Sequence, residues 1–145
     1  MKRHTSLISL SREHHGALIL ARLLRQDAPP YKGLPGDAPG KADYALKFYQ
    51  EEMIEHFHEE EKVISLVRGI NPELDILFHE MEQEHTQLHE LFSLINNNSD
   101  LPGHLDKLGR VLEDHVRKEE RQIFPMIQDN CSEDVLNTIA ETLKT

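Results

Sequence analysis

The sequence predicts an all-α protein: a four-helix bundle with up-down-up-down connections and a short fifth helix at the C-terminus. Three observations support this fold class. Apolar residues recur at intervals of three and four along most of the chain, which is the period of an amphipathic helix. Runs of alternating β-branched residues, which would indicate strands, do not occur in the sequence. Proline, glycine and asparagine gather at a few points and divide the helical pattern into segments.

The first predicted helix covers about residues 5–25 and has an apolar stripe that includes Leu7, Leu10 and Ala17. The stretch that follows, DAPPYKGLPGDAPGK, contains four prolines and three glycines, so we expect a loop over residues 27–41. A connection of this length is unusual in a small bundle. Because it carries no cluster of ligand-type residues, we interpret it as an excursion from the bundle.

The next two helices have recognisable ends. The second covers about residues 42–68 and is stopped by Gly69. The third begins after Asn71, a typical N-cap residue, with Pro72 at its first position, and it ends at residues 96–98, which are all asparagine.

The fourth helix is expected to begin near Ser99 or Asp100, with Pro102 in its first turn. Pro125 should kink or end this helix, since proline has no amide hydrogen to donate. Ser132 then caps the short C-terminal helix at about residues 132–144. The bundle therefore spans about residues 5–128 of a single domain formed by residues 1–145.

Composition excludes several classes of function. The net charge is −10 and no basic stripe is present, which argues against a nucleic-acid partner. No apolar run is long enough to cross a membrane, and the basic start of the chain lacks the apolar stretch of a secretory signal. A single cysteine, Cys131, excludes an intrachain disulfide. We expect a cytoplasmic protein that has no membrane partner, and the sequence does not identify a protein partner.

Seven ligand-type side chains lie in phase with the apolar stripes of the four long helices. They are His14, His56, Glu60, His85, His89, His115 and Glu119. A helix places residues i and i+4 on one face, so three pairs of these residues each point in one direction. Burying so many imidazoles and carboxylates is costly unless something binds them. The pattern therefore predicts a buried metal site.

Two of these assignments have a neighbouring alternative. His15 follows His14, although the apolar phase of the helix favours His14. Glu120 follows Glu119, and again the apolar stripe favours the earlier residue. The remaining histidines are interpreted as surface or packing residues; they are His4, His58, His79 and His104.

The two halves of the chain show a weak internal similarity. When the second predicted helix is aligned with the fourth so that His56 meets His115, Glu60 meets Glu119. When the first is aligned with the third so that His14 meets His85, Leu18 meets His89. The halves therefore resemble related helical hairpins, with one additional histidine in the second, and this predicts two metal ions in unequal environments.

The number of ligands indicates two ions rather than one. Seven ligands exceed the four that a tetrahedral zinc takes. If Glu60 and Glu119 each bridge two ions, the five imidazoles, the two carboxylates and one oxo or hydroxo bridge fill all but one position of two octahedral ions. This mixed nitrogen and oxygen set, with one open position, favours iron, with manganese or a mixed pair of metals as the next alternative. One ion would take His85, His89 and His115, and the ion with the vacancy would take the other two histidines.

The segments HFHEEEKVI and HVRKEERQIFP resemble the two halves of a haemerythrin (HHE cation-binding) domain. SREHHGALIL and EHTQLHELF resemble the first and third helices of that domain. The resemblance covers about residues 5–128 and includes all seven ligand types in the right order. It implies a non-haem di-iron centre inside a four-helix bundle. It also implies that dioxygen, or a related small diatomic or peroxide ligand, binds at the five-coordinate iron.

Two classes of function compete on this sequence. The first is a protein that binds dioxygen reversibly as a carrier, store or sensor. The second is a di-iron enzyme with ferroxidase or peroxidase chemistry, or one that responds to nitric oxide or peroxide stress. The many histidines favour the first class, because ferritin-like sites are rich in carboxylates and are built from Glu-x-x-His motifs.

Overall fold

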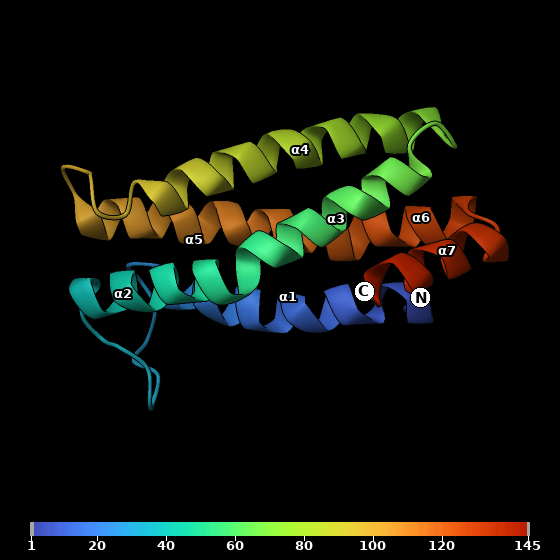
Figure 1. Cartoon of the computed structure of the whole chain (residues 1–145). Coiled ribbons are helices and arrows are strands. Elements are labelled where there is room, and N and C mark those ends of the chain that lie inside the picture. Colours follow the sequence, from blue (N-terminus) through green and yellow to red (C-terminus); the bar gives the residue numbers. More distant parts are fainter. Residues whose placement is uncertain (1, 145) are drawn as a thin grey trace.

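The computed structural model describes residues 2–144, so residues 1 and 145 at the ends of the predicted domain lie outside the described part. The chain runs up and down through four helical rods (Figure 1). The first rod is α1 (Thr5–Leu23) and the third is α4 (Pro72–Ser93). The second rod consists of α2 (Ala38–Phe48), the π-helical turn η1 (Tyr49–Met53) and α3 (Ile54–Val67). The fourth consists of α5 (Leu101–Lys118), the π-helical turn η2 (Glu119–Ile123) and α6 (Phe124–Asn130).

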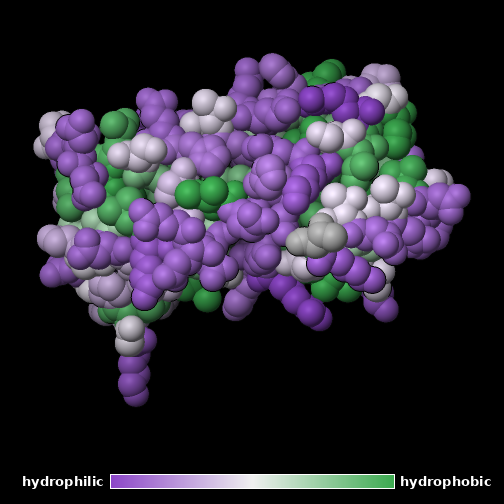
Figure 2. Space-filling view, viewed as in Figure 1, coloured by the Kyte–Doolittle hydropathy of each residue, from purple (hydrophilic) through white to green (hydrophobic). Residues whose placement is uncertain are grey.

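A short helix, α7 (Glu133–Leu143), follows the bundle and packs against α1 and α3. Residues 2–144 contain no strand. The predicted all-α bundle with a short C-terminal helix is therefore confirmed. Within the same residues, no helix is both long and apolar enough to cross a lipid bilayer. Hydrophilic side chains cover most of the face shown in Figure 2, and hydrophobic ones show through in small patches.

The apolar core is divided into two clusters by a polar layer halfway along the bundle. One cluster includes Ala17 and Leu20 of α1 and Leu112 of α5. The other includes Leu10 of α1 and Ile123 of η2. His14 lies between Leu10 and Ala17 in α1, and Glu119 lies between Leu112 and Ile123 in the fourth rod, yet both polar residues are almost fully buried. The two apolar clusters thus exclude water from a layer of polar side chains.

The predicted helix ends agree with the structure at several points. The side chains of Asn71, Asp100 and Ser132 accept hydrogen bonds from the first turns of α4, α5 and α7. Gly69 follows α3 with a φ of 98°, a left-handed conformation that glycine adopts without a steric penalty.

The predicted loop over residues 27–41 is too long at its C-terminal end, because α2 already begins at Ala38. The Asp37 side chain accepts a hydrogen bond from the Gly40 amide, and Pro39 lies in the first turn. An acidic N-cap followed by proline starts a helix. The proline and glycine content of this stretch concealed that signal.

The fourth rod does not end at Pro125 but continues to Asn130. The chain forms the π-helical turn η2 just before the proline, in which the Phe124 amide bonds to the Glu119 carbonyl. In this i to i−5 pattern the Glu120 carbonyl would need the amide hydrogen that Pro125 lacks. Arg3 supplies the missing donor, since its guanidinium donates to the Glu120 carbonyl at 2.8 Å.

Candidate metal centre

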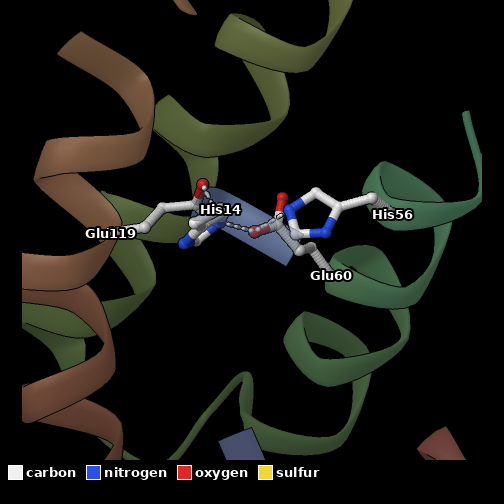
Figure 3. Close-up of side chains that lie close together, drawn as sticks. All are labelled: His14, His56, Glu60 and Glu119. Atoms are coloured by element: carbon white, nitrogen blue, oxygen red, sulfur yellow. Dashed lines mark hydrogen bonds and ion pairs between the residues drawn. The ribbon is translucent and has the colours of Figure 1, made fainter. Parts of the chain in front are cut away.

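Six of the seven predicted ligands meet in the polar layer between the two apolar clusters. They form two groups whose ligand atoms lie within 4.8 Å of one another. The first group is His14, His56, Glu60 and Glu119, and the second is Glu60, His85, His115 and Glu119. All six side chains are buried. Figure 3 shows the first group, in which side chains from α1, α3 and η2 point toward one another.

Both carboxylates are shared between the two groups. One oxygen of Glu60 lies 3.1 Å from Nε2 of His14 and 3.1 Å from Nε2 of His56. Its other oxygen lies 3.0 Å from Nε2 of His85 and 3.8 Å from Nε2 of His115. Glu119 Oε1 lies 2.8 Å from Nε2 of His115 and 3.4 Å from Nε2 of His14. Each carboxylate therefore faces imidazoles of both groups, as a bridging ligand would.

Each of the four histidines uses its other ring nitrogen to contact an outer carboxylate. Nδ1 of His14 donates to Glu120 and Nδ1 of His56 donates to Glu13, both over 2.7 Å. Nδ1 of His85 donates to Glu61 over 2.9 Å, and Nδ1 of His115 donates to Glu84 over 2.7 Å. Such contacts orient an imidazole and fix its tautomer, which leaves the Nε2 lone pair free for a metal. All four rings thus present the same nitrogen to the centre.

The internal sequence similarity is visible in these outer contacts. The alignment that places His14 on His85 relates Glu13 to Glu84, and the one that places Glu60 on Glu119 relates Glu61 to Glu120. The contact between His56 and Glu13 corresponds to that between His115 and Glu84. In the same way, the contact between His14 and Glu120 corresponds to the contact between His85 and Glu61. The two helical hairpins therefore build the same arrangement twice.

The buried charges shift the pKa values of the ligand side chains. Burial alone would lower the pKa of His56, but the charge of Glu60 and the hydrogen bond to Glu13 outweigh it and raise the pKa to about 9. The pKa values of His14 and His115 are raised well above the usual range for the same kind of reason. Burial would raise the pKa of Glu60, yet the surrounding imidazoles hold it well below its ordinary value. Without a metal, the raised pKa values favour the protonated forms of these histidines beside Glu60.

Proton sharing does not satisfy every buried atom in this layer. Nε2 of His115 and both carboxylate oxygens of Glu119 are buried without a hydrogen-bond partner. The 2.8 Å contact between His115 and Glu119 is short enough for an ion pair, but it lacks the alignment of a hydrogen bond. Buried polar atoms without partners are costly. A cation in the polar layer would satisfy these atoms, so the residues present fit a metal.

The chain matches the family model of the hemerythrin HHE cation-binding domain over residues 6–127. The chain belongs to the haemerythrin HHE cation-binding family. Neither the curated proteins nor the solved structures include a significant match to it. The resemblance predicted from the four sequence segments is confirmed. Together with the buried histidine and glutamate cluster, family membership indicates that this haemerythrin domain binds a metal cation.

The seventh predicted ligand, His89, lies outside both groups of this haemerythrin domain. It is half-buried one helical turn from His85. Its Nδ1 shares a hydrogen bond of 2.6 Å with the Tyr49 hydroxyl, and its ring lies 5.2 Å from that of Phe57, measured between centroids. Burial lowers the pKa of His89, which keeps its imidazole neutral. Only Nε2 of this ring remains available to a metal.

His15 and Glu120, the alternative ligands next to His14 and Glu119, both lie outside the two ligand groups. His15 is exposed to solvent, whereas His14 is buried in the centre. Glu120 lies at the outer edge of the centre, on Nδ1 of His14. Among the remaining histidines, His58 and His79 are exposed. His4 contacts Glu133, and His104 contacts the Leu91 carbonyl.

The seven predicted ligands did not include the outer carboxylates of the haemerythrin domain. Glu13 and Glu84 come directly before a ligand histidine, while Glu61 and Glu120 come directly after a central glutamate. The two internal alignments place Glu13 on Glu84 and Glu61 on Glu120. That coincidence is the sequence signal that could have identified them.

Proposed function

We propose that this haemerythrin domain holds two iron ions, bridged by an oxo or hydroxo group, and that it binds dioxygen or a related small diatomic or peroxide ligand. The observation that carries the proposal is the pair of ligand groups that share Glu60 and Glu119. Two shared carboxylates with two imidazoles on either side suit a pair of ions better than a single one. Iron, when bound by these residues, would supply a reversible change of oxidation state.

The protein contributes placement, charge and exclusion of water. Glu60 and Glu119 would bridge the ions, and the four histidines would bind them through Nε2. The outer carboxylates hold the imidazole rings in their orientation. The two apolar clusters close the centre from both ends of the bundle, which limits side reactions with water.

His89 completes the proposed set as a third histidine beside His85 and His115. The Tyr49 hydroxyl holds Nδ1 of His89 as the outer carboxylates hold the other four rings, so ligation would use Nε2. The ion beside His14 and His56 would then have the open position. This division into three and two histidines is the proposed source of reactivity at one iron only.

Reconstitution tests the proposal directly. The metal-free protein is loaded with ferrous iron without air, its iron is measured, and visible spectra are recorded before and after air is admitted. We expect about two irons per chain and a charge-transfer band that bleaches under vacuum. One iron per chain would contradict the paired centre, and rapid irreversible oxidation would contradict reversible binding.

A di-iron enzyme is the second candidate, and one observation favours it. The side chains of Glu13 and Glu61 are 43% and 44% exposed to solvent while they contact ligand histidines. Carboxylates in this position can exchange protons between solvent and the centre, which turnover of peroxide requires and reversible binding does not. Steady consumption of hydrogen peroxide by the iron-loaded protein, without loss of iron, would support the enzyme.

A further inference from the structure

A cavity of about 250 Å³ opens on the side of the centre that carries His56. Its inner wall is formed by the buried residues Met53 and His56, together with half-buried Gly16 and Phe48. Its rim is formed by three exposed charged residues, which are Arg12, Glu13 and Glu52. The cavity therefore leads from a charged opening, past apolar side chains, to a histidine of the candidate metal centre.

We propose that this cavity is the route by which small uncharged molecules reach the metal centre, and that Gly16 and Phe48 set its width. This inference rests on the proposed metal centre and adds the path and the selectivity of its ligand. The cavity is lined by His56, one of the two histidines beside which the proposed open position would lie. Dioxygen, nitric oxide and hydrogen peroxide belong to the class of ligand that would pass.

The width of the route depends on the missing side chain of Gly16. A Cβ atom built at Gly16 would lie 3.3 Å from Cζ and 3.4 Å from Cε2 of Phe48. The phenyl ring at the end of α2 thus packs closely against the glycine of α1 at one edge of the cavity. The π-helical turn η1 begins immediately after Phe48 and ends at Met53, so it forms the same wall. Such turns often occur at functional sites.

The equivalent corner on the opposite side of the centre is built from different side chains. The alignment of His14 with His85 relates Gly16 to Gln87, a long polar side chain, and Glu13 to Glu84. Lys118 donates hydrogen bonds to Glu80 at 2.9 Å and to Glu84 at 3.0 Å, and so ties α5 to α4 beside His115. The Glu84 side chain is accordingly 26% exposed, against 43% for Glu13. The corner beside His56 and the corner beside His115 therefore differ, although the ligands themselves are arranged twice.

Charge decides which molecules the route favours. Two carboxylates and one guanidinium at the rim leave an excess of negative charge, on a chain whose net charge is −10. A negative opening repels anions. The apolar wall of Phe48 and Met53 provides no donor that would replace the hydration shell of an ion. Uncharged molecules therefore have the advantage over anions such as azide.

The experiment measures association rates of nitric oxide and azide by stopped flow on the metal-loaded full chain. Gly16→Val should lower the association rate of nitric oxide by about tenfold or more, which corresponds to about 1.4 kcal/mol added to the activation barrier. The matched control is Gln87→Val, which places the same side chain at the corresponding position of the other hairpin and should leave the rate unchanged. Glu52→Lys makes the rim less negative, so it should raise the association rate of azide severalfold and leave that of nitric oxide unchanged.

Phe48→Ala and Phe48→Trp keep the test decisive if Gly16→Val does not fold. The smaller side chain should speed nitric oxide association and the larger one should slow it. Equal rates for these two variants, or a wild-type rate for Gly16→Val, would overturn the route while leaving the metal centre intact. Metal content is measured on every sample, and a wild-type chain that binds no metal would overturn both the centre and the route.

Discussion

Glu119 and Glu120 are neighbours in the chain, yet their carboxylates contact opposite nitrogens of the same imidazole. Glu119 Oε1 lies 3.4 Å from Nε2 of His14, and Glu120 Oε2 lies 2.7 Å from its Nδ1. The two acids therefore enclose the ring between the interior of the centre and its outer edge. The π-helical turn η2 begins at Glu119, so both residues lie at the point where the helix widens.

Because of this relationship, replacing each of these two glutamates by glutamine should have a different effect on metal binding. Glu119→Gln should remove a bridging ligand and reduce the bound metal by about one ion per chain or more. Glu120→Gln should keep the metal but weaken its binding roughly 10- to 100-fold, as loss of a partner that orients a ligand generally does. Metal analysis and competition with a chelator measure both effects. The opposite order would make Glu120 the ligand.

His89→Leu tests the ligand that lies outside the two groups. If His89 completes the set through Nε2, its loss should lower the iron content or the stability of the loaded protein. His79→Leu is the matched control, because His79 is an exposed histidine on the same helix. Iron analysis and thermal unfolding of both loaded variants provide the measurement. Equal behaviour of the two variants would remove His89 from the ligand set.

The metal-free protein should lose stability as the pH rises from the ordinary pKa of histidine through the raised pKa of His56. That pKa is 6.5 in an unperturbed chain and about 9 in the folded one. A pKa raised by folding means that protonation stabilises the fold, fully below the unfolded value and no longer above the folded value. Thermal unfolding at the two ends of this interval measures the loss. A metal-free protein that becomes more stable over the interval would contradict the prediction.

Metal binding should show the complementary dependence on pH. The imidazoles must lose their protons before they can bind a metal, so apparent affinity should increase over the same interval. The loaded protein should also be less sensitive to pH than the metal-free protein, because the cations replace the protons on the histidines. Chelator competition at several pH values, with unfolding of loaded samples as the control, measures this difference.

Gly109→Ala should destabilise the bundle by about 1–3 kcal/mol, the usual range for overpacking a tight interior. A Cβ atom at Gly109 would clash with the carbonyl oxygen of Ala21, so α1 and α5 would have to move apart. Gly36→Ala is the control, since nothing lies within 4 Å of the added atom there. Urea unfolding curves measure both. Similar midpoints for the two variants would show that the helices can separate without cost.

Much of the fold follows from patterns that are local in the chain. The apolar period of three and four and the caps at Asn71, Asp100 and Ser132 depend only on residues that are close in sequence. The predicted C-terminal end of the loop was wrong, because Asp37 and Pro39 start a helix inside a stretch rich in proline and glycine. Both π-helical turns were also absent from the prediction. The second depends on Arg3, a residue far away in the chain that satisfies the Glu120 carbonyl.

The spacing of residues was enough to predict that four helices carry histidines and glutamates on their apolar faces, since spacing along a helix decides which side chains share a face. The packed fold was needed to show which nitrogen of each imidazole faces inward, that Glu60 and Glu119 serve both groups, and that Nδ1 of His89 contacts Tyr49. Those outcomes depend on how far each helix is rotated about its own axis and which rotamer each side chain adopts. Packing against the neighbouring helices sets both, and no local pattern of residues encodes them.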